Sequence, residues 1–257
     1  MTQQKYFSAL TLVAFFLSLG LIIVPSFLTK VSAQSEPVNQ SQTLPGTSIV
    51  RVTFEPPGSG QPDDTAGGAS RGDECSQAVI AIGGCVTPLV PATTTRLTIA
   101  EHPTFLVYVP PTSAKEIFFG LIDENNNFHY QAKIPISSQE GILSFKLPDN
   151  APPLEIDKNY RWTFIIVGEQ GLRPGIPGVQ GEIRRVRLTS ELMSQIQNQP
   201  LLERAAVYGK NGLWYDTVAS LAEARRLEPS EATLASTWQE LLNSVGLQAI
   251  ATKPLLN

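Results

Sequence analysis

Short apolar runs separated by turn residues divide the chain between residues 89 and 188, and this division constrains the fold more than any other feature. The runs include TRLTIA, TFLVYVP, EIFFGLI, FHYQAKIPI, GILSFKLP, YRWTFIIV and VQGEIRRVRL. All but TRLTIA begin, end or border on Pro, Gly, Asn or Asp, residues that favour turns over strands. Short strands that recur in this way are typical of an antiparallel β-sandwich, which we predict for residues 89–188.

One tyrosine indicates which kind of sandwich to expect. In PLEIDKNYRW, Leu154 precedes Tyr160 by six residues, with a turn between them and a strand after. This spacing resembles the tyrosine corner of immunoglobulin-like and fibronectin type III sandwiches. In that motif the tyrosine hydroxyl bonds to the backbone of the turn, while the leucine enters the core.

The hydrophobic period changes after Leu188, which predicts helices. Thr189 and Ser190 are candidate helix caps, and EATLASTWQELLNSVGL forms an amphipathic helical pattern. Between them, small and large residues alternate at Ala205, Tyr208, Gly212, Leu221, Ala224 and Pro229. This pattern resembles a single tetratricopeptide-type helix pair. We predict an α+β protein, with a bundle of about three to four helices over residues 189–257.

Residues 1–33 have the pattern of a secretory signal peptide. Lys5 precedes an uncharged, mostly apolar run from Phe7 to Val24, and Val31-Ser32-Ala33 offers a cleavage site. The alternative is an uncleaved membrane anchor, since the run would span about 27 Å as a helix. Either reading places the rest of the chain outside the cytoplasm, in the periplasm or the extracellular space.

Residues 34–88 read as a mostly flexible segment with one strand, TSIVRVTF, followed by a Gly- and Pro-rich linker. Cys75 and Cys85 enclose nine residues that include a glycine pair. In an exported protein we expect them to form a disulfide, with free thiols as the alternative. A metal site would need more thiols or nearby histidines.

The charge balance argues against nucleic acid as a partner. The chain has 19 basic and 23 acidic residues, and loss of Lys5 and Lys30 with the leader would take the net charge from −4 to about −6. An acidic protein with scattered basic residues is poorly suited to nucleic acid or to anionic lipid. We expect membrane association only through an uncleaved N-terminal segment.

No catalytic or metal-binding constellation is visible, so we predict a non-catalytic protein without a cofactor or metal. There is no Gly-x-Ser-x-Gly elbow. Asp123, Asn125 and Asn127 imitate the start of a calcium loop. However, Phe128 and Ile134 stand where that loop needs glycine and glutamate. We therefore interpret DENNN as a hairpin turn.

The segment Glu101-His102-Pro103 contains one of the two histidines. Because Pro103 fixes its own φ and pushes His102 towards an extended conformation, we interpret the segment as the entrance to a strand. There, Glu101 and His102 would satisfy local backbone groups or each other. The alternative is a catalytic or ligand-binding role for His102.

Several of these segments together resemble a cyanobacterial protein family, domain of unknown function 928. The resemblance rests on CVTPLVP after a glycine-rich linker, LTIAEHPTFLVYVP, PLEIDKNYRWTFIIV, GEIRRV, AVYGKNGLWYDTVASLAEARR and WQELLNSVGL. It implies an exported, envelope-associated protein with a β-rich domain, a helical tail and no assigned activity.

The remaining functional hypotheses concern binding. We expect the helical region, or the groove between it and the sandwich, to hold another exported or envelope protein. Trp214 and Tyr215 would either form part of that surface or fill the helix-pair core. One alternative is binding of carbohydrate, as cell-wall peptidoglycan or extracellular polysaccharide, by sandwich aromatics such as Phe118, Tyr130 and Trp162. An exported hydrolase is a weaker alternative.

Overall fold

The computed structural model describes residues 50–57, 86–92, 96–169, 171–172, 176 and 178–256. All of them belong to one compact unit, Thr47–Asn257. The predicted signal peptide and the cysteines Cys75 and Cys85 lie outside the described residues. No helix in the described part of the chain is long and apolar enough to cross a membrane.

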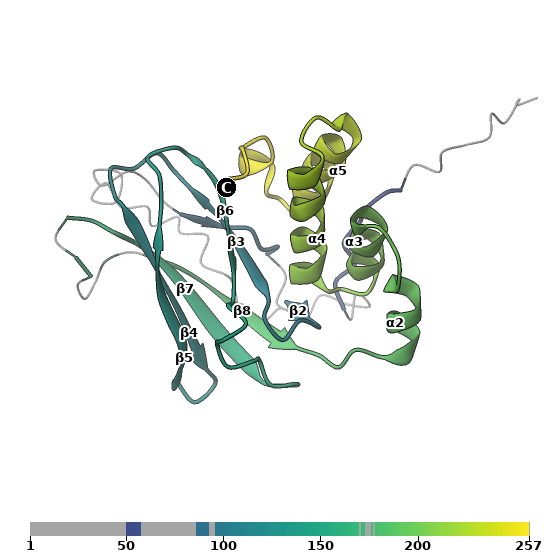
Figure 1. Ribbon diagram of the computed structural model, residues 1–257, viewed down its shortest axis with the longest axis horizontal. Helices are drawn as coiled ribbons and strands as arrows, with labels where there is room; N and C mark the ends of the chain where they lie inside the picture. Colours follow the sequence, from purple (N-terminus) through teal and green to yellow (C-terminus); the bar gives the residue numbers. More distant parts are fainter. Residues whose placement is uncertain are drawn as a thin grey trace, which may run out of the picture. The chain divides into compact units, whose positions relative to one another are not determined.

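The described strands form two sheets, which we call together the β region (Figure 1). The first sheet has the order β1-β3-β6, with β1 at Thr87–Pro88, β3 at Thr104–Val109 and β6 at Gly141–Lys146. The second has the order β2-β8-β7-β4-β5, with β2 at Leu97–Thr98, β4 at Glu116–Asp123, β5 at Phe128–Pro135, β7 at Asn159–Val167 and β8 at Val179–Arg185. Strand pairing is antiparallel except between β2 and β8, which are parallel. The sheets predicted to be antiparallel therefore include one parallel pair, at the edge formed by β2.

The inner faces of the two sheets share one core. Alternate residues of β4 and β7 are fully buried, as period-2 side-chain alternation requires. Phe105 of β3 places its ring 5.0 Å from Phe119 of β4 and 5.9 Å from Trp162 of β7. Aromatic side chains from both sheets therefore fill the space between them.

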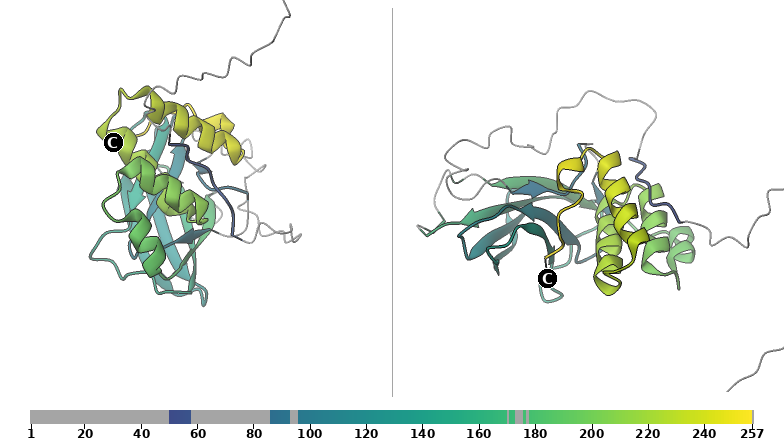
Figure 2. Two further views of the ribbon diagram at one scale, coloured as in Figure 1. Left: turned by 90° about the vertical axis from the view of Figure 1, so that its right-hand side faces the viewer. Right: turned by 90° about the horizontal axis from the view of Figure 1, so that it is seen from above.

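Four α-helices follow the strands in the described part of the chain, which confirms the predicted mixed α+β composition and the helix number. They are α2 (Ser190–Ile196), α3 (Leu201–Lys210), α4 (Trp214–Leu227) and α5 (Ala232–Ser244), and a 3₁₀ turn, η1, covers Gln248–Ile250. Thr189 caps α2 by accepting a hydrogen bond from the Leu192 N–H. The helices stand beside the sheets, with α4 nearest to them and α2 and α3 farther away (Figure 2).

The segment Val50–Pro57 differs from expectation. TSIVRVTF was predicted to be a strand, but no strand forms in the part that the structure describes. Instead, the Glu55 N–H donates to the Gly209 carbonyl at 3.0 Å, and the Phe54 ring packs edge-on against Trp214, 4.9 Å between centroids. A Cβ on Gly209 would collide with the carbonyl oxygen of Thr53. The segment is extended because it lies across the helix pair, not because it pairs with a sheet.

Candidate functional site

The first turn of α4 joins the helices to the β region. Trp214 is 0% exposed and donates from Nε1 to the Leu89 carbonyl at 2.7 Å. Tyr215 is 2% exposed; its hydroxyl accepts from Trp162 Nε1 at 2.6 Å and donates to the Glu182 carbonyl at 2.8 Å. The hypothesis that Trp214 and Tyr215 form a binding surface is therefore wrong. Both rings are buried, and their polar atoms have partners inside the protein.

Asp216, the next residue, makes a second connection to the sheet. Its Oδ2 accepts a hydrogen bond from the Ile99 N–H, just beyond β2, at 3.1 Å. Burial raises the pKa of Asp216 to about 7, because the lost solvation of the carboxylate outweighs its hydrogen bonds. Sequence reasoning missed this residue, since an acid in the first turn of a helix is common.

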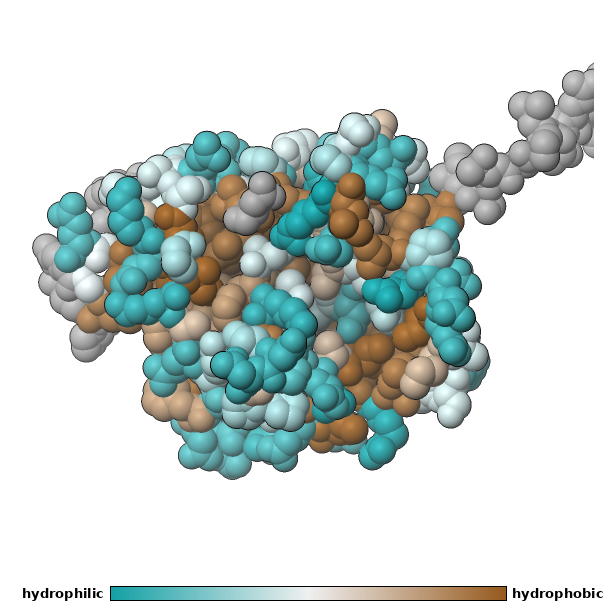
Figure 3. Space-filling view, viewed as in Figure 1, coloured by the Kyte–Doolittle hydropathy of each residue, from teal (hydrophilic) through white to brown (hydrophobic). Residues whose placement is uncertain are grey.

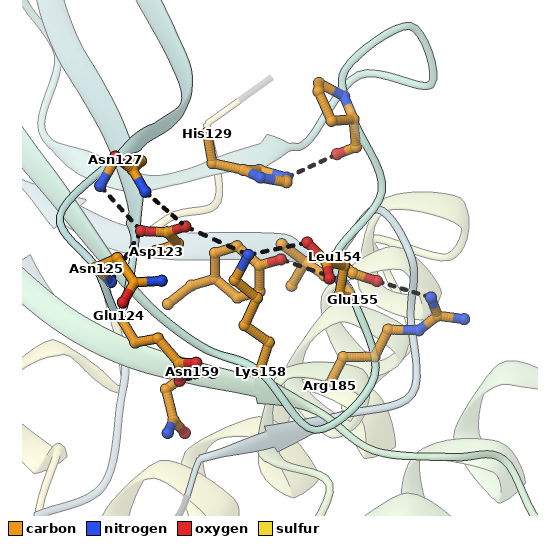
Figure 4. Close-up of polar contacts among 12 residues, drawn as sticks. Asp123, Glu124, Asn125, Asn127, His129, Leu154, Glu155, Lys158, Asn159 and Arg185 are labelled. Carbon is orange, nitrogen blue, oxygen red and sulfur yellow. Dashed lines mark hydrogen bonds and ion pairs between the residues drawn. The ribbon is translucent and has the colours of Figure 1, made fainter.

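A polar network ties the β4–β5 hairpin to the turn before β7 (Figure 4). Asp123 Oδ1 accepts from the N–H groups of Asn125 and Asn127, both at 2.9 Å, and Oδ2 lies 3.3 Å from Lys158 Nζ. These contacts, led by the Asn127 N–H, lower the pKa of Asp123. Lys158 also binds Glu155 at 2.9 Å, and its pKa is raised, chiefly by that contact. DENNN is a hairpin turn, as predicted. The Asp123 carboxylate accepts hydrogen bonds from N–H groups of the same turn.

The residues singled out around Tyr160 meet in the same region. The Tyr160 hydroxyl accepts from the Glu155 N–H at 3.1 Å, and Leu154 is fully buried. The Leu154 N–H donates to the Glu101 carbonyl, and the Leu154 carbonyl accepts from Arg185 Nη1 at 2.7 Å. Arg185 also binds the Glu101 carboxylate at 2.7 Å. Glu101, Leu154 and Tyr160 are thus brought together, with Arg185 as a partner that sequence reasoning did not assign.

Both histidines contact one short segment of backbone. His102 donates from Nε2 to the Ala151 carbonyl at 3.0 Å, and His129 donates from Nε2 to the Pro152 carbonyl at 2.9 Å. Pro103 is buried, and β3 begins directly after it. The sequence offered no spacing that joins the two histidines, but the structure brings them to consecutive carbonyl groups. Among the described residues, neither imidazole forms a hydrogen bond or an ion pair with a carboxylate, although Asp149 interacts electrostatically with His102.

The helices enclose an apolar groove of about 430 Å³ between the start of α3, the end of α4 and the start of α5. Its apolar lining consists of Pro200, Leu201, Leu202, Ala224, Leu227 and Leu234. Leu227 is 67% exposed, so its side chain is accessible at the edge of this groove. Apolar surface is visible over the helical region, among hydrophilic residues (Figure 3).

Two carboxylates border this groove. Glu228 and Glu231 line it, together with Thr233. Glu231 accepts a hydrogen bond from the Thr233 N–H at 3.1 Å, which lowers the pKa of its carboxyl. The groove therefore combines an apolar floor with an anionic rim, an arrangement that suits an apolar segment carrying a basic group.

Among the described residues, no group of three or more His, Cys, Asp or Glu is placed to hold a metal ion. No curated protein matches the chain. A protein family described as Domain of Unknown Function (DUF928) matches residues 66–255, and this stretch is most of the chain. The chain therefore belongs to the DUF928 family.

Proposed function

We propose that this chain is an exported, envelope-associated and non-catalytic protein of cyanobacterial origin that binds another exported protein through its helical region. The signal-peptide pattern of residues 1–33 and the Cys75–Cys85 pair, which we take to be a disulfide, support export to the periplasm or beyond. The carboxylates of Asp123 and Glu155 also support a non-catalytic role. Asp123 accepts a hydrogen bond from the backbone of its own turn, and both carboxylates form ion pairs with Lys158.

The groove between α3, α4 and α5 is the observation that carries this proposal. Its apolar floor and the glutamates Glu228 and Glu231 fit an amphipathic segment with apolar side chains and a nearby Lys or Arg. We regard α3 and α4 as a single tetratricopeptide-type unit, in which such grooves bind peptides. We regard the two sheets as an immunoglobulin-like or fibronectin type III-like sandwich, for which the hydrogen bond of Tyr160 is the main support.

Site-specific cross-linking in cells tests this proposal. A photo-cross-linking amino acid replaces Leu227 in the full chain, and a matched variant carries it at Phe128, an equally exposed apolar residue at the β4–β5 hairpin (72% exposed). We expect a discrete adduct from position 227, with a protein that carries an export signal, and its loss when Leu201→Glu is added. Equal labelling from both positions, or none from either, would refute groove binding.

Carbohydrate binding is the second candidate, and one feature of the outer sheet face favours it. Trp162 is buried, and the half-buried Tyr130 ring already stacks on Phe145, so neither ring offers an open face as a platform. The Phe118 ring is also half-buried, but it lies over Gly120, which has no side chain; a Cβ added there would be 3.1 Å from the ring. Gln131 and Thr163 lie opposite Gly120 on the neighbouring strands. An aromatic ring flanked by amide and hydroxyl groups can stack on a sugar.

Binding to purified cell wall and to extracellular polysaccharide distinguishes this second function from the first. A sugar platform predicts that Phe118→Ala reduces binding about tenfold, the effect of losing roughly 1.4 kcal/mol. Leu227→Glu should leave the same binding unchanged. Retention of full binding by Phe118→Ala would remove this candidate and leave the groove proposal intact.

A further inference from the structure

The segment Lys253–Leu256 extends the first sheet along the outer edge of β6. The Ile142 N–H donates to the Pro254 carbonyl at 2.7 Å, and the Leu256 N–H donates to the Ile142 carbonyl at 2.9 Å. Leu255 is bridged in parallel to Ile142. β3 pairs with β6 on its other side. At Ile142 the backbone edge of β6 is therefore satisfied by a short segment from beyond the helices.

Side chains at this edge fit the two ends of the segment, Lys253 and Leu256. A Cβ on Gly141 would lie 2.6 Å from Leu256 Cδ2 and 2.8 Å from the Pro254 carbonyl, so the segment needs glycine at that position. Lys253 Nζ binds Glu140 Oε2 at 2.8 Å, and the Tyr108 hydroxyl donates to the same oxygen at 2.7 Å. The ammonium group also lies 5.5 Å from the centre of the Tyr108 ring.

The attachment is local and rests on few contacts. Two backbone hydrogen bonds, one partly exposed ion pair and two half-buried leucines hold the segment. Ala251 is buried, whereas Thr252 is exposed and offers a pivot between the 3₁₀ turn and the segment. Regions with few buried contacts open at a small fraction of the free energy of global unfolding. The segment can therefore leave β6 while the helices remain folded.

We propose that the outer edge of β6 is a strand-acceptor site, and that its partner between molecules is the Lys253–Leu256 segment of a second copy. Every copy carries both the acceptor edge and the matching segment, so the complementarity seen within one chain is available between two chains. Exchange of an identical element costs little, because the same contacts form in both arrangements. The binding mode is addition of a strand to a sheet edge. This site is separate from the helical groove and does not depend on it.

A charge-swap complementation in the full chain tests the proposal. In Lys253→Glu and in Glu140→Lys, the segment faces a like charge on its own β6 edge. When the two variants are mixed, each segment meets an opposite charge on the other chain. We expect native mass spectrometry to find about tenfold more heterodimer in the mixture than homodimer in either variant alone. The double variant, which restores the pair within one chain, should match the wild type. Absence of an excess of heterodimer would overturn the proposal.

Two measurements keep the proposal falsifiable if a variant folds poorly. A labelled peptide of residues 251–256 should bind Lys253→Glu, whose own segment is repelled, at least severalfold more tightly than it binds Glu140→Lys. In the wild-type chain, the Leu256 amide should exchange with solvent faster than the Leu106 amide in the central strand β3. Equal peptide binding to both variants, or exchange of Leu256 as slow as that of Leu106, would count against a detachable segment.

Discussion

Replacing Tyr215 by Phe tests the connection between the helices and the β region most directly. The substitution keeps the ring, which packs 5.8 Å from Phe105, and removes only the hydroxyl. Trp162 Nε1 then loses its acceptor at 2.6 Å, and the Glu182 carbonyl loses a donor at 2.8 Å. Because Trp162 and Tyr215 are buried, water cannot readily replace the missing partner.

The expected cost follows from these two contacts. A buried group left without a hydrogen bond costs roughly 1–3 kcal/mol, and loss of a second bond adds about 1 kcal/mol. We therefore expect Tyr215→Phe to lower the free energy of unfolding by about 3 kcal/mol, measured by urea denaturation followed through tryptophan fluorescence. Tyr130→Phe is the matched control, because the structure gives the Tyr130 hydroxyl no hydrogen bond among the described residues. A change below about 0.5 kcal/mol in Tyr215→Phe would refute the reasoning.

Three further predictions concern the same unit. The folded pKa of Asp216, about 7, exceeds the ordinary value, so its contribution to stability is greatest at low pH and is lost as the pH rises towards 7. Asp216→Asn should abolish a fall of about 3 kcal/mol in the free energy of unfolding between pH 5 and 8, measured by urea denaturation; a fall as large as in the wild type would contradict this. Gly181→Ala forces a methyl group into the Trp162 ring and should cost about 2 kcal/mol, whereas Gly168→Ala, with nothing within 4 Å, should be close to neutral in the same assay. Gly209→Ala should displace the Thr53 carbonyl and increase proteolysis within Val50–Pro57; a cleavage rate equal to wild type would show that the segment is not held there.

Local patterns in the sequence were sufficient for most of the elements. The alternation of TFLVYVP, EIFFGLI and YRWTFIIV predicts β3, β4 and β7, because side chains on alternate sides of a strand meet different surroundings. DENNN predicts the hairpin, since its Asp and Asn side chains bond to nearby backbone N–H groups. These features depend on neighbours within a few residues, which a sequence pattern records directly.

Partners far away in the sequence could not be predicted. Val50–Phe54 has the alternation of a strand, but the pattern does not say whether a sheet or a pair of helices covers it. The burial of Trp214 and Tyr215 depends on hydrogen bonds with Leu89 and Trp162, which lie far away in the sequence. A local pattern does not record such partners. The leucines of the groove follow ordinary helical spacing, so the sequence does not distinguish them from core residues. The groove, with Leu227 exposed at its edge, becomes visible only when the ends of α3, α4 and α5 are placed together.

The contacts of Val50–Pro57 with the α3–α4 turn have a consequence for the order in which the chain can fold. Glu55 bonds to Gly209, and Phe54 packs on Trp214. These contacts join residues about 150 positions apart, so Val50–Pro57 cannot be held in place until the later residues are available. α3 and the first turn of α4 must therefore be present before Val50–Pro57 can take its place, and a chain that stops at Arg185 leaves the Trp162 indole without its acceptor.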